Sequence, residues 1–313
     1  MPKTPRQITL KPRSHHIPGI LDTHVFDGTD ADSSAPAELL IEVPHGATKS
    51  EDFHSLADKL DGPHPPDLCD FFHVNTDVGA FEVAAATARR FVEAHPTRRA
   101  KVLRCRIPRT FIDCNRRIDL SKDAFKEGGV TPGLMPWVQA PGDMALLRER
   151  YEAYISTVTS AREELPDNGA VVILHTYAPR TVDVDVDENI VDSLRHAYEP
   201  DVFETWPLRP EFDVICHDLD GNDHGPRHVI DALRGELGKL GWPLEESATY
   251  PLHPSTLAWD HVVALPGRAL CVEVRRDLLA DPFDPFHEMN VCPQKVEPIA
   301  GALARSLSPW MTG

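Results

Sequence analysis

The chain has 313 residues and carries 49 acidic against 32 basic side chains, which gives a formal net charge of −17. This charge repels phosphate backbones, so nucleic acid is not an expected partner. Hydrophobic residues make up 41% and charged residues 26% of the chain, which is ordinary globular usage and argues against wholesale disorder. No apolar run approaches the roughly 20 residues that span a bilayer. Residues 1–16 also lack the apolar stretch of a signal peptide, so we expect a cytoplasmic protein without a membrane partner.

The first 37 residues mix Pro, His, Ser and Asp without periodicity, which predicts an irregular N-terminal arm. The fold is expected to begin with LLIEV, residues 39–43, a run typical of a short buried strand and stopped by Pro44. A Pro-rich loop at 61–67 then leads toward Asp77, and the spacing of residues 81–93 predicts a helix.

Strands and helices are expected to alternate along the rest of the chain. Apolar runs predict strands at 102–107, 170–174, 212–216 and 270–274, and periodicity predicts helices at 144–165, 227–240 and 296–306. The valine–aspartate alternation of residues 181–188 suits an edge strand with one solvated face. The pattern indicates an α/β fold with a mixed, mostly parallel sheet sandwiched by helices, in one domain over residues 38–313.

Two histidines come at the ends of predicted core strands, where α/β proteins bind their ligands. His45 follows the strand at 39–43, and His175 follows AVVIL at 170–174. A single histidine in such a place is more often a structural hydrogen-bonding residue, but two of them favour a metal site. Catalytic zinc commonly takes two histidines and one carboxylate and leaves a position open for water.

Asp77 is the expected carboxylate ligand because it lies in the connection between His45 and the following helix. The same side chain would also suit an N-cap of that helix. Glu51 and Glu82 remain alternative ligands.

A third group of polar residues follows the strand at 102–107. PRTFIDCNRR, residues 108–117, contains Arg109, Asp113, Asn115 and Arg116, and a guanidinium is a planar fork suited to carboxylate binding. A surface turn with salt bridges would use similar residues, so the spacing leaves both interpretations open. Glu273 lies among apolar residues in LCVEV, where burial would raise its pKa toward the range useful to a general base.

Five elements in the same order resemble those of the N-formylglutamate amidohydrolases. PHGAT is similar to the P-H-S-G element of that family, TDVG to its acidic element and RTFIDCNRR to its S-R-x-x-x-D-L-N-R element. ILHTY is similar to D-x-H-S, and CVEVRRDLL to the late Q-x-E-x element. The match covers roughly residues 40–280. It implies a zinc carboxypeptidase-like (phosphorylase/hydrolase-like) fold, shared with the aspartoacylases.

The resemblance also implies a role for each candidate residue. One zinc ion would be held by His45, Asp77 and His175, with Glu273 as general base and acid, Arg109 stabilising the oxyanion, and Asn115, Arg116 and Asp113 binding a substrate carboxylate. The implied enzyme is a zinc-dependent amidohydrolase that cleaves an N-formyl or N-acyl amide on a small carboxylate-bearing substrate such as N-formylglutamate.

The sequence departs from the family pattern at several positions, which implies that specificity has diverged. Thr176 stands where the family has serine, Leu174 and Ile173 replace the aspartate that commonly precedes the histidine, and Gly46 follows His45 without an intervening serine. A zinc carboxypeptidase-type peptidase and a non-catalytic binding protein on the same fold are the alternatives. A formyl or acetyl amide needs a closed pocket, whereas a peptide needs an open groove. A homo-oligomer is compatible with the sequence.

Overall fold

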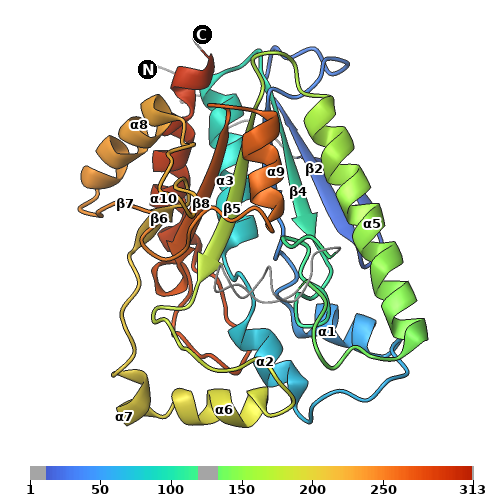
Figure 1. Ribbon diagram of the computed structural model, residues 1–313. Helices are drawn as coiled ribbons and strands as arrows, with labels where there is room; N and C mark the ends of the chain where they lie inside the picture. Colours follow the sequence, from blue (N-terminus) through green and yellow to red (C-terminus); the bar gives the residue numbers. More distant parts are fainter. Residues whose placement is uncertain (1–11, 119–132, 312–313) are drawn as a thin grey trace, which may run out of the picture.

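The computed structural model describes residues 12–118 and 133–311, and a central β-sheet runs through the molecule (Figure 1). Within these residues the sheet has eight strands: β1 (Arg13–Ile17), β2 (Leu21–Asp27), β3 (Leu39–Val43), β4 (Arg99–Cys105), β5 (Ala170–Tyr177), β6 (Phe212–Val214), β7 (Glu245–Glu246) and β8 (Ala269–Arg275). Their order across the sheet is β1-β2-β4-β3-β5-β8-β6-β7.

The centre of the sheet is parallel and its flanks are partly antiparallel. β4, β3, β5 and β8 pair in parallel, whereas β1–β2, β2–β4 and β8–β6 are antiparallel pairs. The central strands β3 and β5 are buried along their whole length, as continuous apolar runs of parallel strands are when helices cover both faces. The predicted α/β class with a mixed, mostly parallel sheet is confirmed.

Helices cover both faces of the sheet. The helices are α1 (Ser50–Ala57), α2 (Leu68–Val74), α3 (Ala80–Ala94), α5 (Pro141–Glu163), α6 (Ile190–Ala197), α7 (Pro200–Phe203), α8 (Arg227–Gly238), α9 (Leu257–Ala264) and α10 (Pro293–Ser306). Apolar residues of α3, α8 and α10 form the core on one face, and those of α1, α2, α5, α6 and α9 form the core on the other. The predicted helices correspond to α3, α5, α8 and α10.

The N-terminal part of the chain corrects one expectation. Residues 13–17 and 21–27 form a hairpin that extends the sheet, so the predicted irregular arm is wrong there. Residues 1–11 lie outside the described part of the chain. β1 could not be predicted from apolar patterning, because its residues are almost all exposed. The strand forms through backbone pairing with β2 rather than through apolar burial. β2 attaches the hairpin to the core through Leu21 and Phe26.

Residues 181–188 contradict the predicted edge strand, because they form no strand. The alternation of side chains is nevertheless real: Val182, Val184 and Val186 pack against the core, while the aspartates between them are exposed. An extended segment lying on the core produces the same period of two as a strand, without a hydrogen-bonded ladder.

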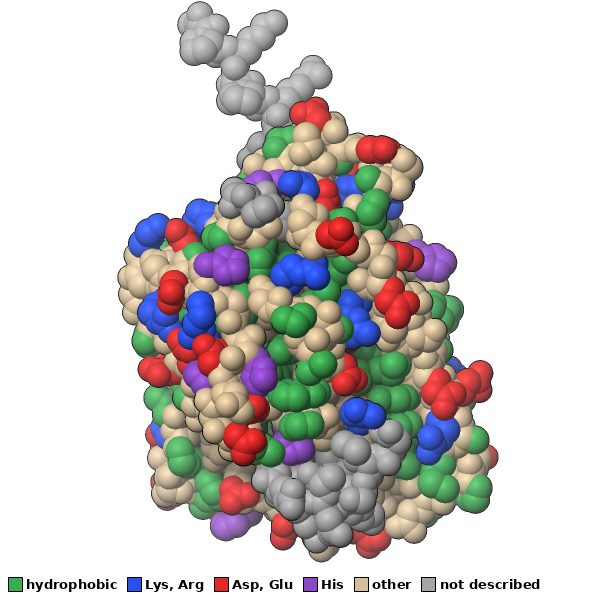
Figure 2. Space-filling view, turned by 45° about the horizontal axis from the view of Figure 1, so that its top comes forward, with side chains coloured by type: hydrophobic (Ala, Val, Ile, Leu, Met, Phe, Trp, Pro, Cys, Tyr) green, Lys and Arg blue, Asp and Glu red, His purple; other side chains and the backbone are tan. Residues whose placement is uncertain are grey.

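The parallel strands point toward the end of the molecule where α1, α2 and α6 lie, opposite both chain termini (Figure 1). On the face shown in Figure 2, acidic and basic side chains are interspersed among hydrophobic ones despite the net charge of −17. No helix within the described ranges is long and apolar enough to cross a membrane.

Candidate metal centre and active site

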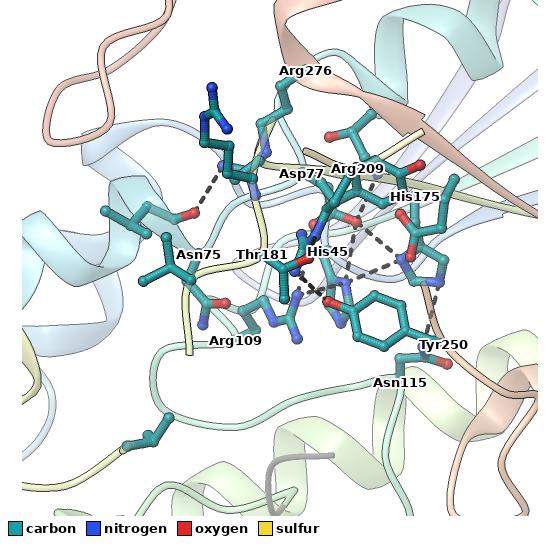
Figure 3. Close-up of a pocket in the computed structure, with 18 of the residues that line it drawn as sticks. His45, Asn75, Asp77, Arg109, Asn115, His175, Thr181, Arg209, Tyr250 and Arg276 are labelled. Carbon is teal, nitrogen blue, oxygen red and sulfur yellow. Dashed lines mark hydrogen bonds and ion pairs between the residues drawn. The ribbon is translucent and has the colours of Figure 1, made fainter. Parts of the chain in front are cut away.

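Three buried side chains converge at the carboxyl edge of the parallel strands. His45 lies just beyond β3, Asp77 lies in the loop before α3, and His175 lies within β5 rather than after it as predicted. Asp77 Oδ2 is 3.2 Å from His45 Nδ1 and 3.0 Å from His175 Nδ1, and the two Nδ1 atoms are 3.2 Å apart. Residues 130 positions apart in the sequence are therefore in direct contact (Figure 3).

These three residues could hold a metal ion. In a tetrahedral site with zinc bonds of about 2.0–2.2 Å, neighbouring ligand atoms lie about 3.3 Å apart, close to the separations seen here. His45 Nε2 is 2.7 Å from Asp113 Oδ1, so the proton belongs on Nε2 and the Nδ1 lone pair faces the cluster. The donor set of two imidazoles and one carboxylate suits zinc.

Asp77 is the carboxylate that the fold brings to the imidazoles. Burial alone would raise the pKa of Asp77, but the two imidazoles outweigh it and hold this pKa well below its usual range. The Thr176 N–H donates to Asp77 Oδ2, and the N-cap of α3 is Gly79 rather than Asp77. Glu51 is exposed in the first turn of α1, and Glu82 lies in α3, so neither belongs to the cluster.

Glu273 stands beside the cluster on β8, paired in register with His175 of β5. Burial raises the pKa of the Glu273 carboxyl to about 7, and the nearby Asp77 carboxylate acts in the same direction. Its Oε2 is buried without a hydrogen-bond partner among the described residues. A carboxyl group with this pKa can both accept and return a proton near neutral pH.

Arg109 lies between the cluster and Asp113. Its guanidinium donates to Asp113 Oδ2 at 2.9 Å, and another of its nitrogens is 3.4 Å from His45 Nδ1 and 3.7 Å from Asp77 Oδ1. Arg109 thus lines the cavity next to the candidate metal ligands.

Asp113 corrects the expectation that it contacts substrate. Its side chain is fully buried, does not line the cavity, and accepts hydrogen bonds from His45, Arg109 and the Asn115 N–H. Asp113 therefore orients these residues from a buried position outside the cavity.

Asn115 and Arg116 both line the cavity on the His175 side. The Asn115 amide Nδ2 is 3.4 Å from His175 Nε2, and Arg116 Nε is buried without a partner among the described residues. A guanidinium and an amide thus face the same space, and both can donate to a carboxylate.

The cavity has a volume of about 610 Å³, and several polar residues in its wall are absent from the candidates chosen from sequence. Arg209 donates to the Tyr250 hydroxyl at 2.7 Å and stacks on the rings of Tyr177 and Tyr250. Asn75 and Arg276 also line the cavity (Figure 3). Only Arg276 had a signal in the sequence, a pair of arginines directly after the strand that carries Glu273.

A second group of potential ligands lies outside this cavity. Cys216, His217 and Glu246 come together, but the Arg227 guanidinium donates to both Cys216 Sγ and Glu246. A cation in that position competes with a metal ion, and burial raises the pKa of the Cys216 thiol to about 12. These residues are therefore a poor metal site.

Comparison with known proteins adds information on the fold. No family model and no curated protein matches the sequence. The structure resembles that of N-formylglutamate amidohydrolase from Ralstonia eutropha JMP134, with a TM-score of 0.58 and 16% identity over 93% of this chain and 98% of that one. A gene product from Agrobacterium tumefaciens matches with 18% identity and a TM-score of 0.49, covering 94% of this chain and 95% of that chain. A metallo-carboxypeptidase from Burkholderia cenocepacia matches with 9% identity and a TM-score of 0.38, covering 93% and 60%.

The chain therefore has an α/β fold with a mixed, mostly parallel sheet and a potential metal site at the carboxyl edge of that sheet. More particularly, its fold is similar to that of the N-formylglutamate amidohydrolase from Ralstonia eutropha JMP134. At 16% identity this similarity concerns the fold alone. The fold agrees with the one that the resemblance of the five sequence elements implied.

Proposed function

We propose that the protein is a metal-dependent amidohydrolase that cleaves an N-formyl or N-acyl amide on a small carboxylate-bearing substrate. The proposal rests on one observation above all: His45, Asp77 and His175 converge with ligand spacing beside Glu273. A divalent ion held there, zinc by its donor set, would supply a Lewis acid and lower the pKa of a water molecule.

The side chains around the cluster supply the rest of the chemistry. Glu273 accepts a proton from the attacking water and returns it to the leaving amine, as its pKa of about 7 allows. Arg109 donates to the oxygen that becomes negative in the tetrahedral stage. Asn115 and Arg116 bind the carboxylate of the amine part and so hold the scissile bond beside Glu273.

The experiment that tests the proposal is metal analysis combined with an assay of N-formyl and N-acetyl amino acids, with and without chelator. Glu273→Gln should keep its bound metal and lose most turnover, because the amide cannot accept the proton. His175→Ala should instead lose metal, because two ligands bind zinc less tightly than three. A fully metallated His175→Ala protein, or a fully active Glu273→Gln protein, would contradict the assigned roles.

A peptidase of the zinc carboxypeptidase type is the second candidate. The cavity volume of about 610 Å³ favours it, because this is in the middle of the range for drug-sized ligands and leaves space around a formyl amino acid. Dipeptides included in the same assay distinguish the two candidates. Preferred cleavage of dipeptides with a neutral N-terminal residue would assign the peptidase activity.

A further inference from the structure

The cavity contains an arginine–asparagine pair on each side of the metal cluster. Asn115 and Arg116 are on the side of His175, as described above. Asn75 and Arg276 are on the other side, where Asn75 immediately precedes the segment that carries Asp77. Figure 3 shows Asn75 and Asn115 on opposite sides of the labelled cluster residues. A molecule bound across the cluster therefore meets a guanidinium and an amide at both ends.

Arg276 is a buried cation that has no carboxylate within ion-pair distance among the described residues, and the Asp77 carboxylate acts on it only from farther away. Its exposed fraction is 4%, and one guanidinium nitrogen donates to the Val74 carbonyl at 2.8 Å. Within the described residues its Nε has no hydrogen-bond partner and its guanidinium forms no ion pair. Burying a guanidinium in this way is costly unless an anion compensates for the lost water.

The neighbouring Arg275 shows the contrast. It is also buried, but its guanidinium pairs with Asp277 at 2.9 Å and Glu211 at 3.3 Å, and it does not line the cavity. Of two consecutive arginines, the one facing away from the cavity is neutralised by the protein. The one that lines the cavity, Arg276, has no such contact with a carboxylate among the described residues, and Asp77 compensates for its charge only from a longer distance.

Asn75 adds a second donor at the same place. It follows the last residue of α2, and its backbone N–H donates to the carbonyls of Phe71 and Phe72 at the end of that helix. Its side-chain amide makes no hydrogen bond to any described residue and lines the cavity. The amide and the Arg276 guanidinium together offer N–H groups that match the two oxygens of a carboxylate.

The charge of the whole cavity agrees with an anionic ligand that has more than one negative group. Among the described residues, its wall contains five arginines, namely Arg109, Arg116, Arg180, Arg209 and Arg276, against three acids, Asp77, Asp183 and Glu273. The excess is positive in a chain whose formal net charge is −17, so the wall of this cavity is locally positive in an acidic protein.

We propose that Asn75 and Arg276 bind a carboxylate on the acyl part of the substrate, so that the enzyme prefers amides whose acyl group derives from a dicarboxylic acid. This inference rests on the proposed function, because it assigns the amine-side carboxylate to Asn115 and Arg116. Water adds to the amide carbonyl carbon and the C–N bond breaks. The products are a dicarboxylate and a free amino acid, whose amine takes up the proton.

Two sources of such an acyl group share the same chemistry. One is a free dicarboxylic acid joined to an amino acid, as in an N-succinyl or N-glutaryl amino acid. The other is an aspartyl or glutamyl residue in a dipeptide, whose side chain carries the carboxylate. Both belong in the assay, and the one that is cleaved faster identifies the source.

The test compares kcat/KM of the metal-loaded wild type for formyl, acetyl, succinyl and glutaryl amides of one amino acid, together with the two acidic dipeptides. The wild type should prefer an acidic acyl group. In the Arg276→Gln variant, kcat/KM for the amides with an acidic acyl group should fall about 10- to 100-fold, which is the usual effect of losing a charged hydrogen bond. The neutral formyl and acetyl amides should change less than about 3-fold. Arg276→Lys, which keeps the charge but not the planar fork, should retain part of the preference.

Arg180→Gln is the matched control, because it removes a charge from the same cavity wall. The Arg180 guanidinium is already engaged by Glu204 and the Trp206 carbonyl, so this variant should keep the wild-type preference. A preference that falls equally in both variants would overturn the inference, since it would reflect the general field of the cavity.

Binding to the metal-free protein gives a readout that is independent of turnover. Millimolar succinate should raise the melting temperature of the wild type but not of Arg276→Gln. The absence of a wild-type shift, or equal shifts in the two proteins, would contradict the inference.

If the wild type cleaves formyl or acetyl amides but has no preference for acidic acyl groups, only this inference fails. If it cleaves no amide in the panel, the proposed function fails as well.

Discussion

The Asp113 carboxylate decides which nitrogen of His45 faces the metal cluster. Asp113 accepts from His45 Nε2 at 2.7 Å and also from Arg109 and the Asn115 N–H, so one fully buried group aligns three residues of the cavity. Burial and the Arg109 guanidinium lower the pKa of His45, but the Asp113 and Asp77 carboxylates outweigh them and raise it above its ordinary value. The orientation of His45 therefore depends on a residue that does not itself line the cavity.

Asp113→Asn should weaken metal binding by about 10- to 100-fold, because the amide oxygen can still accept a hydrogen bond from Nε2–H but does not supply the negative charge that favours the Nε2-protonated imidazole. The dissociation constant for zinc, measured by competition with a chelator, checks this. Asp218→Asn is the control, since the Asp218 carboxylate bonds Asn222 and His224 in a loop that does not line the cavity. Unchanged affinity in Asp113→Asn would show that Asp113 only supports the fold.

The sequence locates the residues of the cluster better than those of the cavity wall. His45, Asp77 and His175 are foreseeable because strand ends of a parallel sheet meet at one edge. Arg209, Tyr250 and Asn75 are not, since loops bring them to the cavity and no local pattern marks them. Asp113 was placed in the right region but given the wrong role, because adjacency in sequence does not tell which side chain faces the substrate.

At the scale of single elements, the mostly apolar strand β3 contains one buried carboxylate, that of Glu42. Glu42 lies in LLIEV and is 1% exposed, and its two oxygens accept from Tyr154 of α5 and His261 of α9, each at 2.7 Å. Burial alone would raise the pKa of Glu42, but His261 and Tyr154 outweigh it and lower this pKa below its ordinary value. The carboxylate thus connects the central strand to two helices.

His261→Ala should lower the free energy of unfolding by about 3 kcal/mol at neutral pH, because it leaves a buried carboxylate with one partner fewer. A carboxylate whose pKa is lowered on folding stabilises the protein above its unfolded pKa, and that contribution disappears as the pH falls through the folded value. The difference from the wild type should therefore shrink under acidic conditions. Urea unfolding of both proteins at several pH values measures this difference in the free energy of unfolding.

The control for this prediction is Val263→Ala in the same helix, whose side chain is 57% exposed. It should change the free energy of unfolding by less than about 0.5 kcal/mol. A difference for His261→Ala that stays constant with pH would indicate a packing defect rather than the loss of a charge partner.

Element boundaries show where periodicity is informative and where it is not. The continuous apolar runs of β3, β5 and β8 mark buried parallel strands, and the long helices α5 and α10 have the expected periodicity. The valine–aspartate segment at 181–188 has a strand-like period but no strand neighbour. Pattern alone reports an extended backbone with one apolar side, and pairing depends on what the rest of the fold places beside it.

At the scale of the whole molecule, the sequence predicts the parallel centre of the sheet and not its antiparallel flank. The β1–β2 hairpin precedes β3 in the chain, yet it joins the sheet beyond β4. A polar strand such as β1 gives no burial signal, so its place depends on an available edge. The centre, where the candidate site lies, is the part that hydrophobic patterning determines.

A metal ion at the cluster would join three separate parts of the molecule: the end of β3, the loop before α3, and β5. Binding to the folded chain only should stabilise it by about 2.7 kcal/mol at a free ion concentration one hundred times the dissociation constant. Thermal unfolding with added zinc and then with chelator should show this difference in the wild type. The double variant His45→Ala/His175→Ala should not respond, because a single carboxylate remains, whereas Asp218→Asn should respond like the wild type. An equal response of the double variant would place the stabilising ion elsewhere.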